Sequence, residues 1–262
     1  MSDYDDGEAS LGLDAIFPEP PRPKTPPPSF TTYTREAAPD GAWKSIEIRL
    51  VGDHPLWGHY LWNAARAFST YLDSNQELYK GRNVLELGAG GGLPGLVTAL
   101  DGAQKVVLTD YPDATLVDNL DFNTQQNLPA SIAANVAVQG YIWGTPVAPL
   151  LEKLPAGRQG FDLVILSDLI FNHSQHDALL KTCEQCTAEP SSAAPPYVLV
   201  FYTHHRPHLA HRDMEFFAKA RERGWSCQEV LTERFPPMFP DDPGAEEVRS
   251  TVHGWRLTRA TE

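Results

Sequence analysis

Val84-Leu85-Glu86-Leu87-Gly88-Ala89-Gly90-Gly91-Gly92 is the stretch of the chain that decides its fold. Its first four residues are mostly apolar and predict a short buried strand, whereas four of the last five are glycines. Pro94 follows, and proline is favoured at the first turn of a helix. A strand, a loop almost without side chains and a helix therefore follow one another. This order is typical of an open α/β sheet, in which ligands bind beyond the carboxyl ends of the strands.

Strand and helix patterns alternate on both sides of the glycine loop. Strands are predicted at 46–50, 83–88, 105–110, 135–138, 161–167, 197–203, 226–233 and 249–258, and helices at 57–72, 94–102, 114–126, 175–187 and 207–223. This alternation predicts an α/β fold whose mainly parallel sheet is covered by helices on both faces. Because no helix separates the last two strands, we expect these two to pair antiparallel.

Residues 1–42 differ in composition from the rest of the chain. They contain eight carboxylates against three basic residues, and eight of the 23 prolines. Such a segment buries too little apolar area to offset the entropy of ordering it. We therefore expect an acidic, proline-rich and largely disordered tail at 1–42 and a folded domain at 43–262. Two alternatives stay open, namely packing of the tail's apolar residues on the domain and a role as a proline-rich ligand.

The charge and cysteine content narrow the class of protein. The net charge of −13 argues against a nucleic-acid partner and suits a basic peptide or protein, although it also serves solubility. The chain has no run of about 18 apolar residues, so no membrane helix is expected. The three cysteines cannot form a disulfide framework. Cys183 and Cys186 form a C-x-x-C pair, but a zinc site would need a second pair of ligands. We expect a cytoplasmic protein without a metal.

Two residues outside the glycines indicate the kind of ligand. A dinucleotide loop of the form G-x-G-x-x-G would place its third glycine at position 93, which is Leu93. The Glu86 carboxylate would repel a pyrophosphate but suits an ammonium group, such as the methionine end of S-adenosylmethionine. Asp110, twenty residues past Gly90 at the end of the next strand, can accept hydrogen bonds from ribose hydroxyls. The alternative role for Asp110 is that of a helix cap.

Several other blocks are narrower in pattern than the glycine loop. They are Leu-Val-Gly-Asp-His-Pro-Leu-Trp-Gly-His at 50–59, Trp-Asn-Ala at 62–64, Thr-Asp-Tyr-Pro-Asp at 109–113, Asp-Asn-Leu at 118–120, Tyr-Ile-Trp-Gly at 141–144, Ser-Asp-Leu-Ile-Phe-Asn-His at 167–173 and Thr-His-His-Arg-Pro at 203–207. Together with 83–90 they make the chain, from about residue 48 to its end, resemble the seven-strand methyltransferases of family 16. Within that family the chain resembles the fungal elongation factor 1-alpha N-terminal and lysine methyltransferases, formerly labelled nicotinamide N-methyltransferases.

The resemblance implies a Rossmann-like sheet of seven strands, mostly parallel with an antiparallel C-terminal strand, and S-adenosylmethionine as cofactor. The residues that it implies as cofactor contacts are Trp57, Gly88, Ala89, Gly90, Asp110, Trp143 and Ser167. To these the charge argument above adds Glu86. For Trp57 an alternative stays open, because the side chain could instead anchor an amphipathic helix in the core.

Asp168 and Phe171 are the candidate catalytic residues. The run Asp168-Leu169-Ile170-Phe171 resembles the family's acidic-x-x-aromatic motif at the substrate entrance, although the family often has tyrosine in the last place. Asp168 could hold an incoming ammonium, and Tyr111, Phe171 or Tyr202 could line its channel by cation–π contact. Capping of the following helix is the alternative role for Asp168. Four histidines, His204, His205, His208 and His211, are interpreted as a loop and helix start near this channel.

Three functions are consistent with the sequence. The first, implied by the resemblance, is methylation of the N-terminal glycine and adjacent lysine of elongation factor 1-alpha by a monomeric enzyme. The second is a small-molecule N-methyltransferase with a nicotinamide-like acceptor. The third is a non-catalytic module that keeps the cofactor fold, but the intact glycine loop and Asp110 argue against it. The sequence does not separate the first two.

Overall fold

A seven-stranded sheet organises the chain in the computed structural model, which describes residues 26–36, 38–190 and 195–259. The strands are β1 (Ser29–Thr34), β2 (Ser45–Leu50), β3 (Asn83–Leu87), β4 (Lys105–Asp110), β5 (Val136–Gly140), β6 (Leu163–Ser167), β7 (Tyr197–Thr203), β8 (Trp225–Arg234) and β9 (Thr251–Arg259). The helices are α1 (Asn63–Ser74), α2 (Leu93–Leu100), α3 (Ala114–Asn127), α4 (Ala130–Ala133), α5 (Ala148–Leu151), α6 (His176–Cys186), α7 (Ala210–Glu222) and α8 (Glu246–Ser250). Short 3-10 turns are η2 (Gln76–Leu78), η3 (His173–Gln175) and η4 (Pro207–Leu209).

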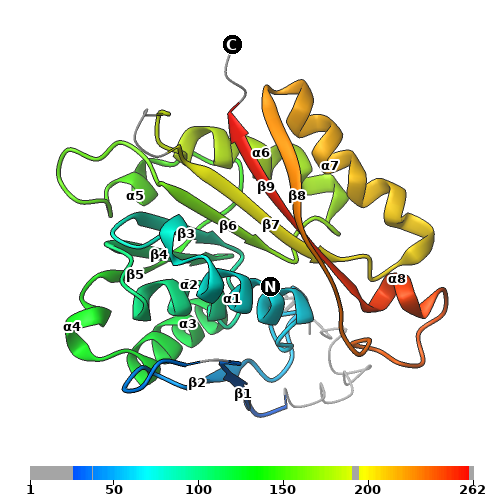
Figure 1. The fold of residues 1–262 in the computed structure, drawn as a ribbon, viewed down its shortest axis with the longest axis horizontal. Coiled ribbons are helices and arrows are strands. Elements are labelled where there is room, and N and C mark those ends of the chain that lie inside the picture. The colour runs from blue at the N-terminus through cyan, green and yellow to red at the C-terminus, as the bar shows by residue number, and fades with distance from the viewer. Residues whose placement is uncertain (1–25, 37, 191–194, 260–262) are drawn as a thin grey trace, which may run out of the picture.

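The strand order in the large sheet is β5-β4-β3-β6-β7-β9-β8 (Figure 1). The first five strands of this order are parallel, and β9 runs antiparallel between β7 and β8. The predicted fold class and the antiparallel pairing of the last two strands are thus confirmed. The chain moves outward in one direction from β3 to β5 and in the other from β6, so the order reverses between β3 and β6. In such sheets this reversal opens the ligand crevice.

Two hydrophobic cores hold the helices against the sheet. Residues of α1, α2 and α3 pack on one face with Ile165 and Leu199 of the sheet, whereas residues of α5, α6 and α7 pack on the other with Val164 and Val198. Side chains of neighbouring positions in a strand point to opposite faces, which is why adjacent residues enter different cores. Both faces of β3 and β6 are therefore apolar, which explains their continuous hydrophobic runs.

The structure differs from the sequence expectation at the N-terminal side of the domain. Helix α1 begins at Asn63, not at Trp57, because the intervening residues form a loop in which Trp57 has a positive φ of 63°. Strand β1 lies within the range expected to be a tail and pairs antiparallel with β2. The expected disorder of residues 1–25 lies outside the described residues. The short helices α4 and α5 are additions that the sequence patterns did not predict.

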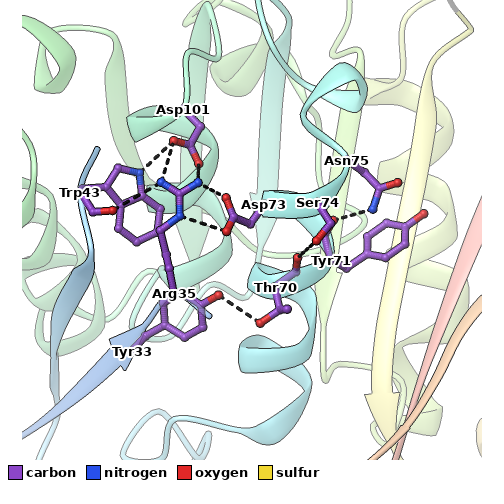
Figure 2. Close-up of polar contacts among 9 residues, drawn as sticks. All are labelled: Tyr33, Arg35, Trp43, Thr70, Tyr71, Asp73, Ser74, Asn75 and Asp101. Carbon is purple, nitrogen blue, oxygen red and sulfur yellow. Dashed lines mark hydrogen bonds and ion pairs between the residues drawn. The ribbon is translucent and has the colours of Figure 1, made fainter. Parts of the chain in front are cut away.

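Arg35, just after β1, attaches this small sheet to the domain (Figure 2). Its guanidinium forms ion pairs with Asp73 at the end of α1 and with Asp101 after α2. The guanidinium also lies 4.2 Å from the centre of the Trp43 ring, and the Trp43 indole N–H donates to Asp101 at 2.9 Å. Because Arg35 is only 7% exposed, these partners replace the water that its charge loses. β1 and β2 are thus part of the folded domain.

Candidate active site

A cavity of about 490 Å³ opens at the carboxyl ends of β3, β4, β5 and β6. Its position matches the reversal of strand order described above. The lining residues are Pro55, Leu56, Trp57, Gly58, Tyr60, Leu61, Trp62, Ala65, Gly88, Ala89, Gly90, Gly91, Gly92, Leu93, Asp110, Tyr111, Leu116, Tyr141, Ile142, Trp143, Ser167, Asp168, Leu169, Phe171, Asn172 and Gln175. Its volume suits a small-molecule ligand, because such pockets commonly measure about 300–1,000 Å³.

The glycine loop forms one wall of this cavity. Gly88 and Gly90 have φ values of 58° and 55°, a conformation that residues with a side chain rarely adopt. A Cβ at Gly88 would lie 2.7 Å from Leu169 Cδ2 and 3.0 Å from Trp143 Cζ2, so packing also requires glycine there. A Cβ at Gly90 would meet nothing within 4 Å. Gly90 therefore leaves open space beside the backbone, which a ligand can approach closely.

Asp110 fixes the position of the glycine loop. Its Oδ2 accepts the backbone N–H of Gly90 at 2.7 Å, and its Oδ1 accepts that of Tyr111 at 2.7 Å. Burial raises the pKa of the Asp110 carboxyl, while these two hydrogen bonds and the neighbouring His54 oppose the rise. The residue that caps α3 is Asp113, whose Oδ1 accepts the N–H of Thr115 at 2.8 Å. The helix-cap alternative for Asp110 is thus wrong.

Glu86 does not line the cavity, in contrast to the expectation that it faces the ligand. Its side chain is fully buried, and its Oε2 accepts the N–H of Gly95 in α2 at 2.8 Å. Burial raises the pKa of Glu86 to about 8, although the hydrogen bond from Gly95 lowers it and the charge of Asp110 raises it further. Glu86 supports the loop-to-helix junction from behind, and direct contact with an ammonium group of the ligand is not proposed for it.

The other four implied cofactor contacts, Trp57, Ala89, Trp143 and Ser167, line the cavity. Trp143 follows β5 and lies against Gly88, and Ser167 ends β6. Trp57 is 47% exposed on the loop before α1, so it is not the core anchor of a helix. Its indole lies over His59, with ring centres 6.0 Å apart.

Asp168 and Phe171 lie on the loop after β6, and both line the cavity. The Asp168 side chain is 5% exposed and accepts the backbone N–H of Thr203 at 3.3 Å and a hydrogen bond from His205 Nε2 at 2.9 Å. It caps no helix, because Asn172 occupies the cap of η3 and α6 begins later. Asp168 thus stands where two neighbouring strands end, facing the cavity.

The channel-lining predictions hold only in part. Tyr111 lines the cavity, but Tyr202 is 1% exposed, packs on Phe217 and directs its hydroxyl to Met214 Sδ at 3.3 Å. Sequence patterns did not identify Tyr60 and Trp62 as site residues, because both fall within the helix predicted at 57–72. Both rings line the cavity.

The histidines that follow β7 have different partners. His205 meets Asp168, whereas His204 Nδ1 lies 2.6 Å from Asp213 Oδ2. His173 Nε2 lies 2.6 Å from the other oxygen of Asp213. Among the residues described by the structure, no group of three or more histidine, cysteine or acidic side chains is arranged to hold a metal ion. The three cysteines are free thiols.

The described part of the chain contains no helix with the length and apolar character needed to cross a bilayer.

Comparison with known proteins identifies the family. The model of the family described as lysine methyltransferase (Methyltransf_16) matches residues 47–223. The protein N-terminal and lysine N-methyltransferase EFM7 of Cryptococcus neoformans is 50% identical over 97% of this chain and 91% of its own length. The protein of the same name from Schizosaccharomyces pombe is 46% identical over 93% and 94% of the two chains.

A solved structure supports the fold. Pyrococcus horikoshii TYW2 in complex with MeSAdo aligns with a TM-score of 0.52 at 15% identity, over 82% of this chain and 69% of that one. The identity is too low to carry more than the fold. The family match and the two fungal relatives cover most of the chain, however, and the glycine loop, Asp110 and Asp168 all lie inside the matched region. The chain therefore belongs to the lysine methyltransferase family and is a protein methyltransferase.

Proposed function

We propose that this enzyme uses S-adenosylmethionine to methylate the N-terminal glycine and the adjacent lysine of elongation factor 1-alpha. The observation that carries the proposal is one cavity lined by the glycine loop, by Asp110 and by the buried carboxylate of Asp168. The name of the fungal relatives, which describes protein N-terminal and lysine methylation, supports the two acceptor amines. The resemblance described from the sequence supports the protein substrate.

The residues of the glycine wall fit S-adenosylmethionine. Gly90 leaves the backbone accessible, and the Asp110 carboxylate retains lone pairs that ribose hydroxyls can use. We assign the cofactor to Gly88, Ala89, Gly90, Asp110, Trp143 and Ser167, with Trp57 covering it from the loop before α1. When bound, the cofactor supplies a methyl group already activated on a sulfonium, so the protein contributes mainly alignment.

The part of the cavity next to Asp168 suits an amine. Asp168 offers a buried negative charge to an ammonium group, and Phe171, Tyr60 and Trp62 line the same cavity with aromatic rings, whose faces attract a cation. The amine must lose a proton before it accepts a methyl group. An α-amine with an ordinary pKa near 7.7–8 is partly neutral at cellular pH, and desolvation among aromatic rings lowers the pKa of a lysine.

A direct transfer experiment tests this function. The purified full-length chain is incubated with methyl-labelled S-adenosylmethionine and a synthetic peptide that carries the N-terminal glycine and lysine of elongation factor 1-alpha. Matched peptides have an acetylated N-terminus or arginine in place of the lysine, and nicotinamide is supplied in a parallel reaction. We expect label at both amines of the free peptide and at the one remaining amine of each blocked peptide. Label in nicotinamide alone would contradict the proposal and favour a small-molecule enzyme.

We further propose that the enzyme acts as a monomer in the cytoplasm. The three free thiols suit a reducing compartment. The proposed substrate is a translation factor, so the enzyme meets it in the compartment where translation takes place.

A further inference from the structure

His205 and Asp168 come together from the ends of two adjacent parallel strands. Asp168 directly follows β6, and His205 lies two residues beyond β7. The Nε2 atom of His205 is 2.9 Å from Oδ2 of Asp168. Asp168 has a positive φ of 59°, which is uncommon for a residue with a side chain and persists only when its surroundings hold it. The pair therefore depends on contacts that fix both partners.

The contacts of Asp168 leave part of its carboxylate free. Oδ2 is held by His205, and Oδ1 accepts the backbone N–H of Thr203 at 3.3 Å. A carboxylate offers about four lone-pair sites, so these two contacts leave about two for a ligand. Asp168 also lines the cavity. An amine in the cavity thus meets a carboxylate whose orientation is already set.

His205 is itself firmly placed. Its backbone N–H donates to the Thr203 carbonyl at 2.9 Å, and its ring meets the Trp62 indole edge-on, with centres 4.8 Å apart. On another side it lines a small hollow of about 10 Å³ with Phe239, Asp242 and two further residues of the β8–β9 connection. The imidazole therefore cannot turn away from Asp168 without disturbing a wall of the main cavity.

We propose that His205 is a positioning residue for the acceptor amine, holding the Asp168 carboxylate so that its free lone pairs receive the incoming ammonium. This inference rests on the proposed function, because it takes Asp168 as the group that meets the acceptor. It adds a residue that touches neither cofactor nor acceptor and acts through its neighbour.

The charge of His205 makes this role dependent on pH. Burial lowers the pKa of His205, but the charge of Asp168, its hydrogen bond and the charge of Asp213 together outweigh burial and the opposing charge of Arg206, so the pKa is raised. Asp242 and Arg249 face His205 across the small hollow. A protonated imidazole offsets the negative charge of Asp168. When the imidazole is neutral, the charge of Asp168 remains available to attract an ammonium group. The KM for the acceptor should therefore fall as the pH rises through the pKa of His205.

Two variants of His205 test the inference. His205→Phe removes the hydrogen bond to Asp168, and His205→Gln keeps a donor but cannot titrate. We expect His205→Phe to raise the KM for the glycine–lysine peptide about tenfold or more, since hydrogen bonds to charged groups contribute about that factor. The affinity for S-adenosylmethionine should stay within about twofold of the wild-type value. His208→Gln, at an exposed histidine of the same segment, is the matched control and should leave both values unchanged.

The pH profile provides the readout that a loss of structure would not produce. The α-amine of the peptide titrates in the same range for every variant. Dividing the KM of His205→Gln by the KM of the wild type at each pH therefore cancels the titration of the peptide and leaves the effect of His205 protonation. We expect this ratio to change with pH near the pKa of His205 and to be flat for His208→Gln. A KM ratio for His205→Gln that does not change with pH, or an unchanged KM in His205→Phe, would overturn the inference about His205 but leave the proposed function standing. Wild-type enzyme that methylates neither amine of the peptide would overturn the proposed function and this inference with it.

Discussion

Asp110 organises the glycine loop because both of its carboxylate oxygens accept backbone N–H groups, one from Gly90 and one from Tyr111. Its residue type and position at the end of β4 were sufficient to predict a role in the site. The sequence could not show that the same carboxylate also holds the loop. A single side chain thus links the geometry of the glycine loop to the proposed cofactor site.

Replacing Asp110 by alanine should therefore damage the cofactor site more than the fold. We expect Asp110→Ala to weaken S-adenosylmethionine binding by about 100-fold or more, because charge-assisted hydrogen bonds to loop and ligand are lost together. Titration calorimetry measures the affinity, and thermal unfolding checks that the domain stays folded. Asp118→Ala, at an exposed position of α3, is the control. An unchanged affinity for S-adenosylmethionine in Asp110→Ala would show that Asp110 does not bind the cofactor.

Glu86 shows where residue-level prediction fails. An acidic residue next to a glycine loop suggested contact with a ligand ammonium, but the side chain points into the core and meets Gly95 of α2. Both faces of β3 are covered, so the sequence gives no signal for which side of the strand a polar residue will face. The outcome is a fully buried carboxyl whose pKa lies near 8.

This raised pKa predicts a pH-dependent stability. The folded chain keeps a proton on Glu86 that the unfolded chain releases near pH 4.5, so the stabilising contribution is complete below that pH and is lost as the pH rises to about 8. Glu86→Gln cannot ionise. The stability of this variant relative to wild type, from urea unfolding, should increase between about pH 5 and about pH 8. Glu47→Gln, at an exposed site, is the control. A pH-independent difference for Glu86→Gln would contradict the assigned pKa.

At the scale of elements, the central strands and the helices between them were predictable to within a few residues. The apolar runs of β3, β4, β6 and β7 mark buried parallel strands, and the periodicity of α3, α6 and α7 marks helices with one buried face. The misses have physical causes. Trp57, Tyr60 and Leu61 are spaced as on a helix, but they line the cavity from the loop before α1. Strand β1 has a β-forming sequence, which the proline-rich composition of 1–42 concealed.

The site, like the fold, was predictable in part from the sequence. The glycine loop, Asp110 and Asp168 each stand at a strand end, and strand order brings these ends together, so the sequence could indicate them. The contact of Asp168 with His205 depends on the side-chain directions at two neighbouring strand ends. No local pattern carries that information, which is why the sequence interpretation gave His205 only a place in a loop.

The attachment of β1 and β2 gives a prediction at this scale. Arg35→Met leaves Asp73 and Asp101 without their cation, and breaking a buried ion pair from one side costs about 3–5 kcal/mol. We expect the free energy of unfolding in urea to fall by about 3 kcal/mol or more. Lys44→Met, an exposed cation in the same small sheet region, should change it by less than about 0.5 kcal/mol. An equal effect of the two substitutions would show that Arg35 does not anchor this sheet.

At the scale of the whole molecule, the net charge of −13 favours a basic peptide over an acidic one. Because salt screens interactions between exposed charges over about 10 Å at 0.1 M, the KM for the glycine–lysine peptide should rise as sodium chloride is increased. Steady-state assays at several ionic strengths measure this. The affinity for S-adenosylmethionine, bound inside the cavity, serves as the internal control and should change less. A peptide KM that is independent of salt would show that the acidic surface does not assist the encounter.

The central claim is that the cavity at the carboxyl ends of β3 and β4 binds S-adenosylmethionine through the glycine loop and Asp110. Isothermal titration of the full-length chain tests it most directly. The account predicts saturable binding of S-adenosylmethionine at one site per chain and no binding of a nicotinamide dinucleotide. No heat with S-adenosylmethionine, together with tight binding of the dinucleotide, would contradict it.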